Sequence, residues 1–447
     1  MIAADASAPV VIVGAGPAGL AAARALRLRG IPYLQFERHS DVGGLWDIDN
    51  PGTPMYRSAH FISSRDASGF FDVPMPKRYA DYPSRLEILE YTRAFADRFG
   101  LRDGIRFGVS VDAVRQEDDG SWTVETSAGV ERAAAVICCS GVNWDPRMPE
   151  VPGEFTGQVI HSRDYRDAAE FAGRRVLIVG LGNSGADIAC DAATTAEAAF
   201  ISARRGYHFV PKHILGKPTD ENNSLPLWAE RALYAVMRPI VIGDVTRWGL
   251  QKPDHRLFET HPLLNTQLLH HLQHGDVRAR PGIERFEGDG VVFADGSREQ
   301  VDLVVFATGY DMSIPYLPAD YLPWQGGRPR MYLNAFARER EGLFGVSYIE
   351  TNSSAYTLFD HVANLVASYL ADVRDDPARA ARFRELASTD DPDLTGGIRF
   401  VESDRHSGYV EVHAFTKAIA RTVKRMGWKP LAPGMFAALE TRAADAR

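Results

Sequence analysis

The sequence predicts an α/β protein with two Rossmann-like dinucleotide-binding units. Each unit starts with a short run of aliphatic residues, continues through a turn that contains three glycines, and enters an alanine-rich helical stretch. The first run begins at Val10 with its turn at Gly14, and the second begins at Val176 with its turn at Gly180. A strand, a G-x-G-x-x-G turn and a helix in this order are typical of dinucleotide-binding folds.

Length and composition support this prediction and exclude other classes. The chain has 447 residues, of which 45% are hydrophobic and 24% charged, so two or three globular domains are expected. Its net charge of −8, without a basic run, argues against nucleic acid or an anionic membrane as the main partner. Prolines and glycines interrupt the uncharged stretch 6–23, and the N-terminus lacks a basic signal-peptide region. We therefore expect a soluble, cytoplasmic protein.

The cysteines and histidines predict neither a disulfide framework nor a metal site. Only Cys138, Cys139 and Cys190 occur, an odd count without metal-ligand spacing. The histidines at 270, 271 and 274 have no acidic residue in helical register beside them, so we expect no metal.

The first unit carries the pattern of a site for an adenine dinucleotide. Gly14, Gly16 and Gly19 permit a tight turn and a close approach of the backbone to a pyrophosphate at the helix N-terminus. Glu37 follows the next aliphatic run, where a carboxylate accepts hydrogen bonds from ribose hydroxyls.

The second unit differs at its ribose position. Gly180, Gly182 and Gly185 form its turn, but the stretch 201–206 contains no acidic residue and instead contains two arginines, Arg204 and Arg205. Guanidinium groups suit the dianion of a 2′-phosphate, so we expect this unit to prefer NADPH to NADH.

Two dinucleotide sites in one chain imply FAD in the first and NADPH in the second, with hydride passing from nicotinamide to flavin. A disulfide reductase would need a redox-active cysteine pair near residues 43–46, and no cysteine lies in that region. Relay of electrons through thiols is therefore excluded.

A further motif lies between the two turns. Its residues are Phe155, Gly157, His161 and Tyr165, and it resembles the fingerprint F-x-G-x-x-x-H-x-x-x-[YF] of the flavin-containing monooxygenases. Other pieces agree in order with this family: residues 43–46, 55–58, 72–76 and 306–310. The resemblance extends from about Val10 to Leu370.

This resemblance implies a discontinuous FAD domain, formed by residues 1–165 and 305–447, and an NADPH domain at 166–304 that includes a helical insertion. By position, the family's FAD contacts fall on Gly14, Gly16, Gly19, Glu37, Leu45 and Trp46. Its NADPH contacts fall on Gly180, Gly182, Asn183, Ser184, Gly185, Ser202, Arg204 and Arg205. Thr308 and Gly309 lie on the segment that crosses between the domains.

The resemblance also implies the chemistry. Flavin reduced by NADPH would react with O2 to give a C4a-hydroperoxide, which oxygenates a small-molecule substrate at an amine nitrogen or a sulfide sulfur. Such a reaction needs a dry pocket more than a protein acid or base. A homodimer is plausible for a chain of this family and size.

One position departs from the family pattern. Many members have an asparagine that contacts flavin and NADP+, and alignment places Ile62 there, with Ser63 and Ser64 following as candidate replacements. Isoleucine cannot donate a hydrogen bond, so the departure affects the oxygenation step. Three alternatives stay open: a Baeyer–Villiger enzyme, whose fingerprint usually ends in Trp instead of Tyr165, an uncoupled NADPH oxidase that makes hydrogen peroxide, and a dinucleotide-binding regulatory module.

Overall fold

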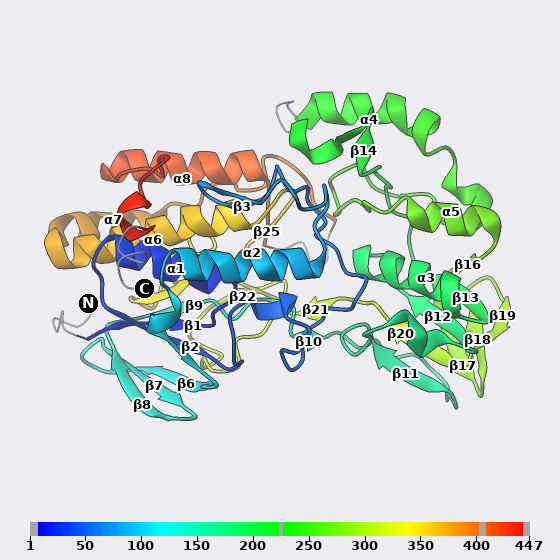
Figure 1. Cartoon of the computed structure of the whole chain (residues 1–447), viewed down its shortest axis with the longest axis horizontal. Coiled ribbons are helices and arrows are strands. Elements are labelled where there is room, and N and C mark those ends of the chain that lie inside the picture. Colours follow the sequence, from blue (N-terminus) through cyan, green and yellow to red (C-terminus); the bar gives the residue numbers. More distant parts are fainter. Residues whose placement is uncertain (1–7, 223–226, 402–407, 441–447) are drawn as a thin grey trace.

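Two parallel sheets form the frame of the protein. The computed structural model describes residues 8–222, 227–401 and 408–440. Each of the two sheets has five strands, and Figure 1 shows them side by side along the long axis of the molecule. The predicted α/β fold with two Rossmann-like units is confirmed.

The first sheet has the strand order β24-β9-β1-β2-β5, and all neighbours are parallel. Its strands are β1 (Val10–Val13), β2 (Tyr33–Glu37), β5 (Ile105–Phe107), β9 (Ala135–Cys138) and β24 (Leu343–Gly345). Every residue of β1 is buried, as expected for the centre of a parallel sheet that is covered on both faces.

Helices cover one face of this sheet and share its hydrophobic core. They are α1 (Pro17–Leu28), α2 (Arg85–Arg98), α6 (Tyr356–Asp375), α7 (Pro377–Thr389) and α8 (Val412–Met426). A capping box starts α2: the Ser84 hydroxyl accepts from the Glu87 N–H, and the Glu87 carboxylate accepts from the Ser84 N–H. An antiparallel sheet of β6 (Val111–Gln116), β7 (Trp122–Thr126) and β8 (Gly129–Ala133) extends from the same unit.

The second sheet has the strand order β11-β20-β12-β13-β16, again parallel throughout. Its strands are β11 (Gln158–His161), β12 (Arg175–Val179), β13 (Ala198–Ser202), β16 (Val277–Arg280) and β20 (Leu303–Phe306). It is accompanied by α3 (Asn183–Thr195), α4 (Leu227–Val241), α5 (Gln267–His274) and the antiparallel strands β17 (Ile283–Glu287), β18 (Gly290–Phe293) and β19 (Arg298–Gln300).

The remaining elements are short. Paired strands of two residues each are β3 (Gly69–Phe70) with β4 (Val73–Pro74), β10 (Asp145–Pro146) with β21 (Tyr310–Asp311), β14 (His213–Ile214) with β15 (Lys217–Pro218), β22 (Trp324–Gln325) with β23 (Arg328–Pro329), and β25 (Glu350–Thr351) with β26 (Tyr409–Val410). The 3-10 turns are η1 (Gly44–Trp46), η2 (Arg102–Gly104), η3 (Ala168–Phe171), η4 (Thr219–Asn222) and η5 (Val245–Trp248).

Strand pairing bears on how the chain is divided. Strand β11 precedes residue 166, yet it pairs with β20 in the second sheet, and β20 itself spans residue 304. The strands at both predicted boundaries thus belong to one sheet. The division into 1–165, 166–304 and 305–447 stays a prediction. Within the described part of the chain, no helix combines the length and apolarity needed to cross a membrane.

A buried ion pair joins the main helices of the first unit. Arg24 of α1 is fully buried, and its Nη2 lies 2.7 Å from Oδ1 of Asp360 on α6. The other oxygen of Asp360 accepts a hydrogen bond of 2.6 Å from the Phe71 N–H. Three segments distant in the sequence thus meet at one carboxylate, which would be left without a cation if Arg24 were removed.

We expect Arg24→Ala to lower the free energy of unfolding by about 3–5 kcal/mol, because breaking a buried pair leaves an uncompensated charge. Urea-induced unfolding followed by tryptophan fluorescence measures this loss. The control is Arg78→Ala, which breaks the exposed ion pair with Glu90 and should cost at most about 1 kcal/mol. Equal losses in the two variants would contradict the structural role assigned to Arg24.

Candidate active site

The first glycine turn packs tightly against its surroundings. Gly14 has φ +102°, and a Cβ at that position would lie 2.7 Å from the carbonyl oxygen of Cys139, just after β9. A Cβ on Gly19 would lie 2.0 Å from the Gly14 carbonyl oxygen. Neither position accepts a side chain, so both glycines are required by the fold itself.

Gly16 differs from its two neighbours in the turn. It is the N-cap of α1, it has φ −72°, and a Cβ added there would have Cα of Gly44 as its nearest atom, at 3.5 Å. No side chain among the described residues caps the helix, so the N–H groups of its first turn are not satisfied by a cap. Such an N-terminus fits the pyrophosphate of a dinucleotide.

Glu37 ends β2 beside this turn, and it is buried. One carboxylate oxygen accepts a 2.6 Å hydrogen bond from the Ala15 N–H, and the other accepts one of 2.9 Å from the His39 N–H. A carboxylate has about four lone-pair positions, so two remain for the hydroxyls of a ribose. The N–H groups of the helix N-terminus and the acceptor oxygens of Glu37 therefore fit an adenine dinucleotide.

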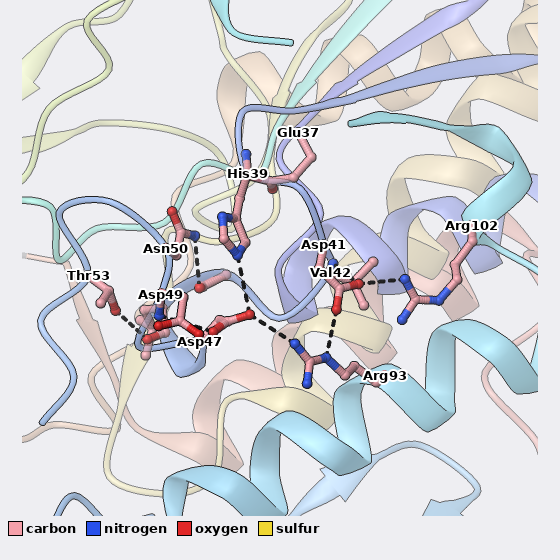
Figure 2. Close-up of polar contacts among 12 residues, drawn as sticks. Glu37, His39, Asp41, Val42, Asp47, Asp49, Asn50, Thr53, Arg93 and Arg102 are labelled. Atoms are coloured by element: carbon pink, nitrogen blue, oxygen red, sulfur yellow. Dashed lines mark hydrogen bonds and ion pairs between the residues drawn. The ribbon is translucent and has the colours of Figure 1, made fainter. Parts of the chain in front are cut away.

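A chain of polar and charged side chains that sequence reasoning missed starts at His39, two residues after Glu37 (Figure 2). His39 Nε2 lies 3.2 Å from Oδ2 of Asp47, which also pairs with Arg93 Nη2 at 3.0 Å. Arg93 in turn pairs with Asp41 at 2.7 Å, and Asp41 pairs with Arg102. The chain connects the end of β2 with α2 and the turn that follows it.

The same region fixes the turn that contains Leu45 and Trp46. The amide of Asn50 donates to the Gly44 carbonyl at 3.0 Å, and the Thr53 hydroxyl donates to the Leu45 carbonyl. Asn50 and Thr53 are buried. Polar residues shortly after a double glycine were the only sequence signal for these contacts.

The second glycine turn repeats the geometry of the first. Gly180 has φ +114°, and a Cβ there would lie 2.4 Å from the carbonyl oxygen of Ala307, just after β20. A Cβ on Gly185 would lie 2.0 Å from the Gly180 carbonyl oxygen. Gly182 is the N-cap of α3, again without a side-chain cap from the described residues. Asn183 and Ser184 are the first two residues of the helix, so a second pyrophosphate fits here.

The residues predicted to bind the ribose and its phosphate in the second site differ in burial and in their partners. Ser202 is buried, and its hydroxyl donates to the Pro281 carbonyl at 2.6 Å. Both arginines that follow β13 are exposed. Arg205 lies 3.4 Å from a carboxylate oxygen of Asp254, whereas Arg204 makes no ion pair with any residue that the structure describes. Arg204 is thus the guanidinium with the least competition for a phosphate.

Phe155 and Gly157 of the fingerprint have packing roles. The Phe155 ring lies 5.0 Å from that of Phe286. A Cβ on Gly157 would lie 2.6 Å from the Phe155 ring and 2.7 Å from the Asp302 carbonyl oxygen. These two positions hold the entry to β11 against its neighbours.

His161 ends β11 and lies against the segment that crosses between the units. Its Nδ1 accepts a 3.1 Å hydrogen bond from the Arg163 N–H, and its ring lies 5.1 Å from that of Tyr310. Burial lowers the pKa of His161 below its ordinary value, so the imidazole is neutral at pH 7. Beside it, the Thr308 hydroxyl donates to the Arg147 carbonyl at 2.5 Å.

Gly309 completes the crossing segment. Its carbonyl accepts a 3.0 Å hydrogen bond from the Arg147 N–H, and it has φ +84°. The carbonyl and the N–H of Arg147 therefore both bind the crossing segment to the loop before β11.

The three residues at the departure from the family pattern differ in exposure. Ile62 is 37% exposed, Ser63 is half-buried and Ser64 is fully buried. The Ser64 N–H donates to Asp220 at 2.7 Å, but its hydroxyl has no partner among the described residues. Ser64 is thus one of three serines, with Ser68 and Ser354, whose buried hydroxyls have no hydrogen-bond partner among the described residues.

Comparison with known proteins agrees with this geometry. A family model described as flavin-binding monooxygenase-like matches residues 7–414. Flavin-containing monooxygenase 5 of Cavia porcellus is 30% identical over 436 residues, covering 89% of this chain and 79% of that protein. The probable indole-3-pyruvate monooxygenase YUCCA8 of Arabidopsis thaliana is 30% identical over 371 residues, covering 75% of this chain and 85% of that protein.

A solved structure shares the fold. S-allyl-L-cysteine S-oxygenase from Allium sativum aligns with a TM-score of 0.64 and 21% identity, covering 98% of this chain and 93% of that chain. The family match includes both glycine turns, the fingerprint and the crossing segment, which confirms the resemblance predicted from the motifs. The chain therefore belongs to the flavin-binding monooxygenase-like family and is an enzyme of the flavin monooxygenase class.

Proposed function

We propose that the protein binds FAD at the first glycine turn and NADPH at the second, and that it uses O2 to oxygenate an amine nitrogen or a sulfide sulfur. The observation that carries the proposal is the contrast between the two helix N-termini. The first has the buried carboxylate of Glu37 beside it. In the second unit the strand next to the turn, β13, is followed by Arg204, which is exposed and pairs with no acid among the described residues. A ribose prefers the former, and a 2′-phosphate the latter.

The bound flavin supplies hydride uptake from NADPH and activation of O2. The chain's own residues would hold the two cofactors. Thr308 and Gly309 fix the crossing segment, and neutral His161 adds no charge beside it. We assign the remaining predicted cofactor contacts, at Leu45, Trp46 and the first residues of α3, on the same grounds of position.

Ile62 favours a second candidate function, that of an NADPH oxidase. Its side chain offers no hydrogen bond where the resemblance implies an asparagine, so a flavin site here would have one polar contact fewer. Ser64, whose buried hydroxyl has no described partner, and Ser63 next to it are the candidates to replace that contact. The yield of hydrogen peroxide per NADPH, with and without an amine or sulfide, distinguishes oxidase from monooxygenase.

We further propose a cytoplasmic location and a homodimer. The location rests on the three cysteines, which are buried and free, as is usual in a reducing compartment. Analytical ultracentrifugation of the purified holoenzyme would measure the oligomeric state.

Gly16→Ala tests the FAD site. The variant should fold, because the added methyl group meets only the Gly44 backbone, with Cα nearest at 3.5 Å, but the methyl group obstructs the approach of a pyrophosphate. We expect the ratio of bound flavin to protein to fall by about tenfold. The visible absorbance of flavin relative to the ultraviolet absorbance of protein measures this ratio. Circular dichroism monitors folding. Full flavin content would refute the assignment.

Arg204→Ala tests the NADPH site. Loss of a charge-assisted pair worth about 1.5–3 kcal/mol should raise KM for NADPH by about 10- to 100-fold and leave KM for NADH unchanged. Arg205→Ala is the matched control and should have a smaller effect, since Asp254 already engages Arg205. Steady-state oxidation of both cofactors gives the constants. Equal changes for NADPH and NADH would remove the 2′-phosphate assignment.

Ile62→Asn tests the departure from the family pattern. The side chain is 37% exposed, so the fold should tolerate asparagine, and one restored hydrogen bond of about 1 kcal/mol should lower peroxide yield by about fivefold. A peroxidase-coupled assay measures the yield. Ile62→Leu adds no donor and should behave like the unmodified protein. An unchanged yield in Ile62→Asn would show that this position does not control the oxygen reaction.

A further inference from the structure

Helix α3 presents two carboxylates, one turn apart, to a segment of the first unit. Asp187 and Asp191 lie four residues apart on this helix, so they share one face. The segment that meets them contains Tyr56 and Ser58, which lie between the η1 turn and α2. This helix is also the one whose N-terminus is assigned to NADPH.

One carboxylate oxygen of Asp191 accepts hydrogen bonds from two hydroxyl groups. Tyr165 donates at 2.8 Å, and Ser58 donates at 2.5 Å. The Tyr165 side chain is fully buried, and its ring stacks on Phe171 with 4.8 Å between centroids. Burial, reinforced by the charge of Asp191, raises the pKa of Tyr165, so the phenol keeps its proton and remains a donor.

Asp187 makes a second connection one turn nearer the helix N-terminus. Its Oδ2 accepts from the Tyr56 hydroxyl at 3.1 Å, and its Oδ1 accepts from the Asn265 amide at 2.7 Å. Burial, reinforced by the charge of Asp187, raises the pKa of Tyr56, so this phenol also remains a donor. The Tyr56 ring lies 5.7 Å from that of Tyr165, so the two connections form one cluster.

The cluster connects elements that must be placed accurately for the proposed reaction. On one side lies the segment that continues from Leu45 and Trp46, assigned to FAD, and on the other lies the helix assigned to NADPH. Hydride transfer requires reacting atoms about 3–3.5 Å apart, and a misplacement of about 1 Å can cost about 100-fold in rate. The contacts that fix α3 against residues 56–58 lie between these two elements, and neither Asp191 nor Ser58 is assigned to a cofactor.

We propose that Asp191 is a positioning residue for hydride transfer, acting through Tyr165 and Ser58. The proposal rests on the proposed function, because it takes the first unit as the flavin site and the second as the NADPH site. Asp191 lies at the ninth residue of α3, beyond the first turn that is assigned to the pyrophosphate. Its removal should therefore affect the rate of transfer and not the affinity for NADPH.

The test is anaerobic reduction of the flavin-loaded protein by NADPH in a stopped-flow instrument. Asp191→Ala should lower the rate constant at saturating NADPH by about 10- to 100-fold and change the NADPH dissociation constant by less than about threefold. Asp191→Asn keeps a carbonyl acceptor, so it should recover most of the rate. Isothermal titration of NADP+ provides a measure of affinity that does not depend on turnover.

Two sets of controls separate positioning from a general loss of stability. Arg57→Ala removes an exposed ion pair with Asp167 at the same junction and should leave both constants unchanged. Tyr165→Phe and Ser58→Ala each remove one donor, and their effects should not add to that of Asp191→Ala. Should the alanine variant at 191 fail to retain flavin, these two variants test the same contacts.

Two outcomes would overturn the proposal. Wild-type reduction rates in Asp191→Ala would do so, as would a loss confined to NADPH affinity. Failure of the proposed function would be distinct, because the unmodified protein itself would then show no flavin reduction by NADPH.

Discussion

The structure depends on one steric constraint that occurs twice. In each unit the glycine turn directly follows a strand, β1 or β12. Its first glycine lies so close to the backbone that follows a neighbouring parallel strand, β9 or β20, that no Cβ fits between them. Gly14 lies against the Cys139 carbonyl, and Gly180 lies against the Ala307 carbonyl, each with a positive φ. This close approach brings a helix N-terminus to the carboxyl edge of each sheet, where ligands bind in open α/β folds.

Around these turns, side chains supply the charged and hydrogen-bonding groups that glycine lacks. Glu37 is fixed by backbone N–H groups, and the His39, Asp47 and Arg93 chain connects its strand to α2 (Figure 2). In the second unit the corresponding place is left to an exposed arginine. The two sites therefore share a backbone geometry and differ in electrostatics, and this difference supports the proposal that they bind different cofactors.

The structure gives each fingerprint residue a specific contact. Phe155 and Gly157 pack the entry to β11, His161 lies neutral against the crossing segment, and Tyr165 reaches a carboxylate on α3. None of these positions requires a role in bond making. Together they pack the segment between the two glycine turns against β17, the crossing segment and α3.

The sequence by itself determined the fold class, both glycine turns and the family, because these depend on local patterns: a buried strand, glycines at fixed spacing and a helix. It could not distinguish Ser202, whose hydroxyl is used by Pro281, from Arg204, nor Ser63 from Ser64. It also missed His39, Asp47 and Asp191, since their partners lie on other elements. Only the tertiary structure decided these points, because hydrogen-bond partners and burial follow from how distant segments pack and not from residue type.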